Sequence, residues 1–255
     1  GGEGEKERTA VIYIHGGGMS RFSCTYENYA TFGRMVAHHN TVVILPDFRN
    51  SHIPARPGLA TGLFPAGLQD VVAVIEWVHQ NRAPLGVCRL VVSGESGGGN
   101  LAISSTLHLH RQPGQGIVDA LFVLCPEVSG IYPNPLYPST LENNGILLDY
   151  PDDVPAVRIE KYGHRLHDTK NAEAWPEYAT PADLRLLPPT TVVANEFDPF
   201  RDENIAFYRR LMTANPAVKH NCITLHGTVH GIGSGYLPNL CPEITQRVAA
   251  HIASS

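Results

Sequence analysis

Short, continuous runs of apolar residues recur along the chain, separated by longer amphipathic segments. Runs of about four to eight apolar residues are typical of strands that are covered on both faces of a sheet. Most of the runs here are continuously apolar rather than alternating. Six of them are predicted strands: Thr9–Ile14, Thr41–Leu45, Leu90–Ser93, Ala120–Cys125, Thr190–Ala194 and Cys222–Leu225.

The segments between these runs carry apolar residues at helical spacing. Leu68–Val78 repeats its apolar side chains every three or four positions, and Pro65 stands near its start. The other predicted helices are Tyr29–His38, Glu203–Met212 and Ile244–Ile252. Alternating strands and helices predict an α/β fold with a mostly parallel, doubly wound sheet, in a single domain over residues 1–255.

The stretch from Gly130 to Pro189 breaks this alternation. It is rich in Pro, Tyr and Asn, it shows no strand pattern, and it is far longer than an ordinary connection. A structureless loop of this length is uncommon in a compact domain. We therefore expect a helical cap insertion over residues 130–189, lying over the carboxyl ends of the strands as a lid or a pocket wall.

Composition and charge exclude several classes of function. The 255 residues are 43% hydrophobic and 17% charged, with a net charge of −5. Such a chain has no basic surface for nucleic acid or anionic lipid, so we expect neither partner. Its apolar runs are too short for a transmembrane helix, and residues 1–8 lack the apolar core of a secretory signal.

The cysteines indicate a reducing compartment. There are five, an odd number, and they are scattered without a C-x-x-C motif: Cys24, Cys88, Cys125, Cys222 and Cys241. Three of them fall in or beside apolar runs. We therefore expect buried free thiols and a cytoplasmic location.

A nucleophile motif follows the third predicted strand. Gly94–Gly98 reads G-x-S-x-G, directly after the apolar run Leu90–Val92 and before the helix-like stretch Asn100–Ile103. A sharp turn between a strand and a helix lifts a serine off the sheet edge, and flanking glycines tolerate the strained backbone. The motif is common by chance, so Ser96 needs partners elsewhere in the chain to be read as a catalytic nucleophile.

Oxyanion donors are predicted where the first strand ends. Thr9–Ile14 runs into His15-Gly16-Gly17-Gly18, and glycine amides can approach a substrate oxygen without a Cβ in the way. A flexible loop or a weak phosphate loop are the alternatives. A Walker phosphate site is excluded because the required lysine is missing.

An acid and a base are expected after the last two predicted strands. Asp198 lies just past the strand that ends at Ala194, with Glu196 and Asp202 as competitors, although Asp202 is explained equally well as a helix cap. His230 follows the last strand and precedes a glycine, with His226 as its competitor. Serine, acid, histidine is the chain order of a serine-hydrolase triad on a doubly wound sheet.

The thirteen histidines also raise the question of a metal site. None of the histidine pairs, such as His226 and His230, has neighbouring Cys or Glu residues at the spacing of zinc motifs. We expect no metal and no organic cofactor.

Four motifs together resemble the hormone-sensitive-lipase-like family of α/β-hydrolase carboxylesterases. They are H-G-G-G at 15–18, G-E-S-G-G-G-N at 94–100, D-P-F-R-D at 198–202 and V-H-G at 229–231. The resemblance runs over nearly the whole chain. It implies Ser96 as nucleophile, His230 as base and Asp198 as its partner, with the amides of Gly17, Gly18 and Gly97 as the oxyanion hole.

The resemblance also assigns structural roles. Asp47 and Arg49 match positions that tie the loop after a neighbouring strand to the oxyanion turn. In the family, the strand–turn–helix segment that carries the serine is called the nucleophile elbow. Glu95 replaces the aspartate that is common in this elbow, and its role is read as structural too.

The chain departs from the family before the glycine loop, because only 14 residues precede His15. The N-terminal cap and the first strands of the family thus have no counterpart here, and Thr41–Leu45 would lie at a sheet edge. We expect a preceding segment or a second chain to cover that edge. The remaining pocket wall would be the 130–189 insertion, and Met19, Tyr132, Tyr137 and Trp175 are candidates for its lining, with ordinary packing as the alternative.

These observations predict a serine carboxylesterase for short- to medium-chain esters, with lactones as a further candidate class. The alternatives are an amidase or deacetylase with the same triad, and a ligand-binding receptor on the same fold. Retention of all three triad residues disfavours the receptor. Ile244–Ile252 is a candidate homodimer contact, although its apolar face is explained equally by packing on the sheet.

Overall fold

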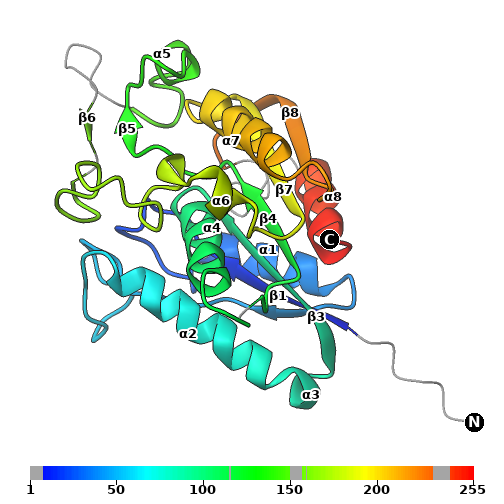
Figure 1. Ribbon diagram of the computed structural model, residues 1–255. Helices are drawn as coiled ribbons and strands as arrows, with labels where there is room; N and C mark the ends of the chain where they lie inside the picture. The colour runs from blue at the N-terminus through cyan, green and yellow to red at the C-terminus, as the bar shows by residue number, and fades with distance from the viewer. Residues whose placement is uncertain (1–7, 115, 150–156, 159, 232–241) are drawn as a thin grey trace, which may run out of the picture.

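The computed structural model describes residues 8–114, 116–149, 157–158, 160–231 and 242–255. Six strands form one parallel sheet in the order β2-β1-β3-β4-β7-β8 (Figure 1). Their bounds are β1 Arg8–Ile14, β2 Val42–Ile44, β3 Val87–Glu95, β4 Ala120–Leu124, β7 Thr190–Phe197 and β8 Asn221–Val229. The prediction of a mostly parallel α/β sheet is confirmed, and each predicted strand overlaps an observed one.

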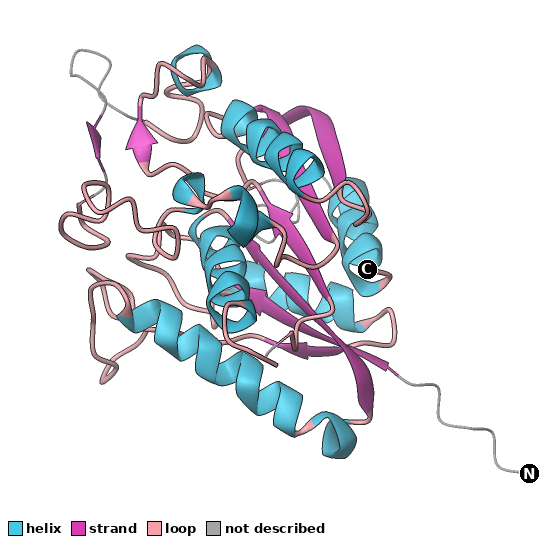
Figure 2. Ribbon diagram, in the orientation of Figure 1, coloured by secondary structure: helices cyan, strands magenta, loops and turns pink. Residues whose placement is uncertain are grey.

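Helices cover both faces of this sheet (Figure 2). One face packs against α2 (Ala66–Gln80), α4 (Gly97–His110) and α7 (Arg201–Ala214). The other face packs against α1 (Glu27–Ala37) and α8 (Pro242–Ala253). The one-turn helix α3 (Arg82–Leu85), which the apolar pattern did not predict, ends at Gly86 in the left-handed conformation just before β3.

The continuous apolar runs are explained by burial on both faces. In β1, Ala10, Ile12 and Ile14 belong to the hydrophobic cluster on one face of the sheet. The intervening Val11 and Tyr13 belong to the cluster on the other face, and every one of these side chains is fully buried. Because successive side chains of a strand point to opposite faces, a strand between two helical layers needs apolar residues at every position.

The 130–189 region differs from its prediction. It contains two strands, β5 (Ile131–Tyr132) and β6 (Val157–Arg158), which pair antiparallel. Its helices are single turns, namely α5 (Ser139–Glu142), the 3-10 helix η1 (Pro176–Tyr178) and α6 (Pro181–Leu184). The description of this region as strand-free is therefore wrong, and the helices in its described part are limited to these turns. Figure 1 shows β5, β6 and α5 at the end of the molecule away from the N-terminus.

The sheet begins at an edge strand, as predicted for residues 41–45. In the described chain β2 pairs with β1 alone, and its three residues are half-buried.

The predicted helix at 244–252 belongs to α8, which covers the same face of the sheet as α1. Its residues Val248, Ala249 and Ile252 are buried in the same hydrophobic cluster as residues of α1. Packing within the chain thus accounts for the apolar face of that helix.

The thiols are less buried than expected. Cys125 is buried, Cys24 and Cys222 are half-buried and Cys88 is exposed, and all four are free; Cys241 lies outside the described residues. The expectation of buried thiols therefore holds for Cys125 alone among the described cysteines. No helix in the described part of the chain is long and apolar enough to span a membrane.

Candidate active site

Ser96 lies at the sharp turn between β3 and α4. Its backbone angles are φ 53° and ψ −123°, a conformation that residues other than glycine rarely adopt. Only 9% of the residue is exposed. Gly98, at the start of α4, packs so closely on the end of β1 that a Cβ there would overlap the carbonyl groups of Ile14 and His15. The glycines of the elbow thus allow the turn to press against the glycine loop.

The glycine loop follows β1 and reaches the elbow from the side. Gly17 and Gly18 have φ values of 105° and 59°, and a Cβ on Gly97 would lie 2.7 Å from the Gly18 nitrogen. The amides that the sequence assigned to an oxyanion hole therefore belong to two backbone segments in direct contact. His15 anchors the loop: its ring stacks on Phe48 with centroids 4.4 Å apart, and burial lowers its pKa to about 4.

Asp47 connects the loop after β2 to the segment that follows the glycine loop, and its Oδ1 lies 3.8 Å from Nε2 of His15 at the start of that loop. Its carboxylate accepts hydrogen bonds from Ser23 Oγ at 3.0 Å and from the Cys24 amide at 2.8 Å. Arg49, by contrast, does not contact the oxyanion turn as expected. Its guanidinium binds Asp70 of α2, with Nη2 2.8 Å from Oδ1, so Arg49 fixes its loop to a helix rather than to the oxyanion turn.

A histidine and an aspartate meet beyond the ends of β7 and β8. His230 Nδ1 donates to Asp198 Oδ2 at 2.8 Å, and Asp198 is fully buried. The Phe200 amide donates to the other carboxylate oxygen at 2.9 Å. Burial lowers the pKa of His230, but the charge of Asp198 and the hydrogen bond between them raise it more, so the pKa lies well above 6.5.

The competing residues lie outside this pair. The His226 side chain is 80% exposed, with Nδ1 3.6 Å from Glu196 Oε2. Glu196 accepts a hydrogen bond from the Gly227 amide at 2.6 Å, so its carboxylate has a structural role at the end of β8. The reading of Asp202 as a helix cap is wrong, because α7 begins at Arg201 with Phe200 as N-cap and without a side-chain cap.

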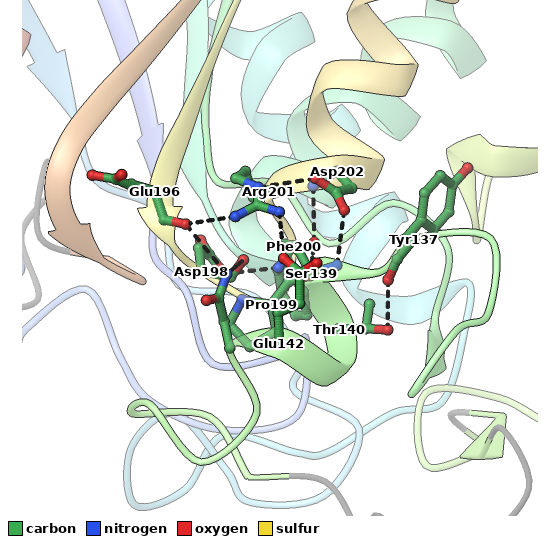
Figure 3. Close-up of polar contacts among 11 residues, drawn as sticks. Tyr137, Ser139, Thr140, Glu142, Glu196, Asp198, Pro199, Phe200, Arg201 and Asp202 are labelled. Atoms are coloured by element: carbon green, nitrogen blue, oxygen red, sulfur yellow. Dashed lines mark hydrogen bonds and ion pairs between the residues drawn. The ribbon is translucent and has the colours of Figure 1, made fainter.

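Asp202 belongs instead to a polar cluster beside Asp198 (Figure 3). The Ser139 amide donates to Asp202 Oδ2 at 2.8 Å, and Ser139 Oγ donates to the Pro199 carbonyl at 2.8 Å. Arg201 joins the cluster through Asp202 and the Glu142 carboxylate of α5, with Nη2 2.8 Å from Glu142 Oε2. These contacts attach α5 to the loop that carries the buried acid.

Ser96, His230, Gly17 and Gly18 line one cavity of about 380 Å³. Its apolar wall comprises Phe22, Leu147, Leu148 and Phe200. Its charged lining comprises Arg21, Glu95, Glu127, Asp149 and Lys161. Among these wall residues, only Glu95 in G-E-S-G-G-G-N and Phe200 in D-P-F-R-D belong to a motif, so sequence reasoning had no signal by which to find the others.

The four pocket residues expected from the sequence do not line this cavity. Met19, Tyr132 and Trp175 are fully buried, and Tyr137 is nearly so. The Tyr132 hydroxyl donates to Glu203 Oε1 at 2.8 Å, and the Tyr137 hydroxyl donates to Glu177 Oε2 at 2.9 Å. Trp175 packs in the core among other aromatic rings. Packing, the alternative explanation, is therefore correct for all four.

Metal-ligating side chains also gather at this point. Among the described residues, Cys125, Asp198 and His230 have ligand atoms within 4.8 Å of one another. Two of the three are already bonded to each other as the histidine–aspartate pair. Elsewhere in the described part of the chain, no group of three or more His, Cys, Asp or Glu side chains lies close enough together to hold a metal ion.

Comparison with known proteins gives one consistent result. Residues 11–234 match a protein family described as alpha/beta hydrolase fold. Carboxylesterase NlhH of Mycobacterium tuberculosis is 30% identical over 80% of this chain and 60% of its own length. The chain thus spans less than two thirds of that relative.

Two solved structures resemble the whole chain. Esterase Est22 superposes with a TM-score of 0.88 at 38% identity, over 97% of this chain and 72% of its own. Brefeldin A esterase, described as a bacterial homologue of human hormone-sensitive lipase, superposes with a TM-score of 0.85 at 33% identity, over 99% of this chain and 70% of its own.

Proposed function

Because this chain belongs to the α/β-hydrolase family, among its carboxylic ester hydrolases of the hormone-sensitive-lipase-like kind, we propose that it hydrolyses esters with Ser96 as nucleophile. His230 is the general base, and Asp198 is the acid that orients it. One observation carries the proposal: Ser96 and His230 line the same cavity while His230 Nδ1 is held by Asp198 at 2.8 Å.

The mechanism follows from this arrangement. Asp198 accepts a hydrogen bond from the Nδ1–H of His230, which keeps the proton on Nδ1 and leaves Nε2 as the basic nitrogen on the other side of the ring. Ser96 Oγ attacks the ester carbonyl carbon while Nε2 takes the hydroxyl proton. The same proton then passes to the departing alcohol, and an acyl-enzyme remains. Water activated by His230 attacks the acyl carbonyl and releases the acid.

The tetrahedral intermediates carry a negative charge on the former carbonyl oxygen. The amides of Gly17, Gly18 and Gly97 are the proposed donors to this oxygen, since the two loops that carry them are in contact. Backbone donors at fixed positions stabilise the charge without reorganisation, and the loss of one such donor typically costs about 3 kcal/mol of transition-state stabilisation.

The cavity sets the substrate class. A volume of about 380 Å³ with a partly apolar wall suits short- to medium-chain esters, and lactones of similar size remain candidates. The triad needs no metal or organic cofactor for this reaction. An amidase or deacetylase would use the same residues, but no contact in the cavity favours an amide over an ester.

The test combines labelling with substitution. Incubation with a serine-directed organophosphonate should place one adduct on Ser96, located by mass spectrometry of the digested protein. Ser96→Ala should lower turnover of a short-chain chromogenic ester by about 10⁴-fold or more, as triad removal does elsewhere. Ser254→Ala at the exposed C-terminal end is the control, and it should keep full activity.

The alternatives predict different outcomes in the same assays. An adduct on another residue, or undiminished turnover by Ser96→Ala, would refute the mechanism. Faster cleavage of an anilide than of the matched ester would favour the amidase. Tight ligand binding without turnover would favour the receptor.

A further inference from the structure

Glu127 is a buried carboxylic acid in the proposed active site that the triad mechanism does not use. It follows β4, and its amide donates to the Ser96 carbonyl at 3.1 Å. Its side chain lines the cavity that Ser96 and His230 line, yet only 5% of the residue is exposed.

The carboxyl group of Glu127 has no hydrogen bond or ion pair with any residue of the described chain. The other buried glutamates differ. Glu95 accepts from the Tyr13 hydroxyl at 3.4 Å, and Glu203 accepts from the Val128 amide and the Tyr132 hydroxyl, each at 2.8 Å. Leaving a buried polar group unpaired costs free energy, so such groups are usually bonded to something. The position of Glu127 in the cavity means that a bound molecule can supply that partner.

Its neighbours locate the partner relative to the reacting carbonyl. A Cβ on Gly18, one of the proposed oxyanion donors, would lie 3.6 Å from Glu127 Oε2. The Tyr162 hydroxyl is also buried and has no hydrogen-bond partner among the described residues. Burial raises the pKa of Tyr162, and the charge of nearby Glu127 raises it further. A group that bonds to Glu127 therefore lies within a few atoms of the ester carbonyl.

We propose that Glu127 is a specificity-determining residue that binds a hydroxyl group carried by the substrate near its ester carbonyl. This inference rests on the proposed function and names the substrate class of the same site, namely hydroxy-substituted acyl esters. A carboxyl group can accept a hydrogen bond from a hydroxyl in its ionised form and can donate one in its neutral form.

Two observations favour a hydroxyl over a cationic partner. Burial raises the pKa of Glu127 to about 7, so at neutral pH the neutral form is well populated, and an ammonium group would gain little from it. The charge of His230, which acts on Glu127, would repel a second cation at that carboxyl group, whereas Arg21 and Lys161 are offset by Glu95 and Asp149 in the same cavity. A neutral hydroxyl avoids both penalties.

The experiment compares p-nitrophenyl 3-hydroxybutanoate with p-nitrophenyl butanoate. The wild-type ratio of kcat/KM should favour the hydroxy ester by about 10-fold or more, since a site built to bond a hydroxyl discriminates strongly against the analogue without it. Glu127→Leu should bring the ratio close to one. Glu127→Gln, which keeps hydrogen-bonding groups of the same shape, should retain part of the preference.

Controls separate this inference from the proposed function. Asp149→Asn removes another carboxylate of the cavity, an exposed one, and should leave the ratio unchanged. If the wild type hydrolyses both esters equally, or if Glu127→Leu keeps the preference, the inference is wrong while the esterase function stands. Failure to hydrolyse either ester would refute the function itself. A stronger preference for p-nitrophenyl 3-aminobutanoate would overturn the choice of a hydroxyl partner.

Discussion

At the scale of single residues, the proposed chemistry depends on electrostatics that a motif does not reveal. The sequence identified Ser96, Asp198 and His230 from their order and neighbours. Only the structure shows that Asp198 is fully buried and bonded to His230, and therefore that the histidine is held in an environment that favours its charged form. Glu127 is the opposite case, because no motif marks it and its proposed role rests on its burial and its place in the cavity.

The raised pKa of His230 predicts an alkaline optimum. Only the neutral imidazole can act as a base, so kcat/KM should rise with pH through a pKa well above 6.5 and be below its maximum at neutral pH. Asp198→Asn removes the charge that raises this pKa, so the acidic limb should move to lower pH while kcat falls by about 10⁴-fold. A pH–rate profile with a short-chain ester measures both effects; an unmoved limb would show that another group titrates.

At the scale of elements, the site is built where backbone segments meet without side chains between them. The start of α4 contacts the end of β1, which requires Gly98 at the contact. The sequence reported these glycines as parts of motifs, and the structure gives the reason for them. The main wrong prediction also concerns elements. The 130–189 region has too little periodicity in its sequence to reveal its short strands and single-turn helices.

Substitution of Gly98 tests this close packing. Gly98→Ala would ordinarily favour a helix, but its Cβ would overlap the Ile14 and His15 carbonyls, so we expect a loss of about 2 kcal/mol or more in the free energy of unfolding. Gly116→Ala is the control, since no atom lies within 4 Å of its Cβ, and it should change stability by less than about 0.5 kcal/mol. Urea denaturation compares the two; equal stabilities would show that the elbow and loop are not in contact.

A substitution in the cluster around Asp202 tests whether α5 positions Asp198, the proposed triad acid. Asp202→Ala removes the acceptor for the Ser139 amide and one partner of Arg201, so the Asp198 loop loses its support. We expect kcat/KM for a short ester to fall by about 10-fold, since small displacements of catalytic groups are costly. The acidic limb of the pH profile should also move to lower pH, because a displaced Asp198 raises the pKa of His230 less. A loss of stability alone would not move this limb.

The matched control for this prediction is Glu142→Gln. Glu142 belongs to the same cluster through Arg201, but its side chain is 56% exposed. Ion pairs that are this exposed contribute less than about 1 kcal/mol, so activity and pH profile should stay unchanged. If both variants behave alike, Asp202 has no special role in holding the loop.

At the scale of the whole molecule, a parallel sheet brings distant segments to one edge. The glycine loop follows β1, the elbow follows β3, and the acid and base lie at the ends of β7 and β8. All these strands run in the same direction, so their carboxyl ends lie together and the site forms there. The edge position of β2 also belongs to this scale, and covering of that edge by another segment or chain stays a prediction.

Burial of acidic groups in the core makes global stability depend on pH. Burial raises the pKa of Glu203 from 4.5 to about 8, so the folded protein keeps a proton that the unfolded chain releases between these values. This contribution is therefore complete in acid and is lost as pH rises towards 8, on the order of a few kcal/mol. Glu203→Gln cannot titrate and should lose less stability over the same range. Thermal unfolding of both proteins at a series of pH values measures the difference, and parallel curves would refute it.

The sequence by itself determined the sheet, its helical layers and the identity of the proposed triad, since these depend on local periodicity and on motifs that need special backbone geometry. Residues such as Ile12 and Ser96 carry that information in their immediate neighbours. The tertiary structure alone decided the lining of the cavity, because a wall residue is selected by what packs behind it. Tyr132 and Trp175 looked like pocket residues and are core, whereas Glu127 looked ordinary and faces the site. That difference lies in contacts between residues distant in the chain, which no local pattern records.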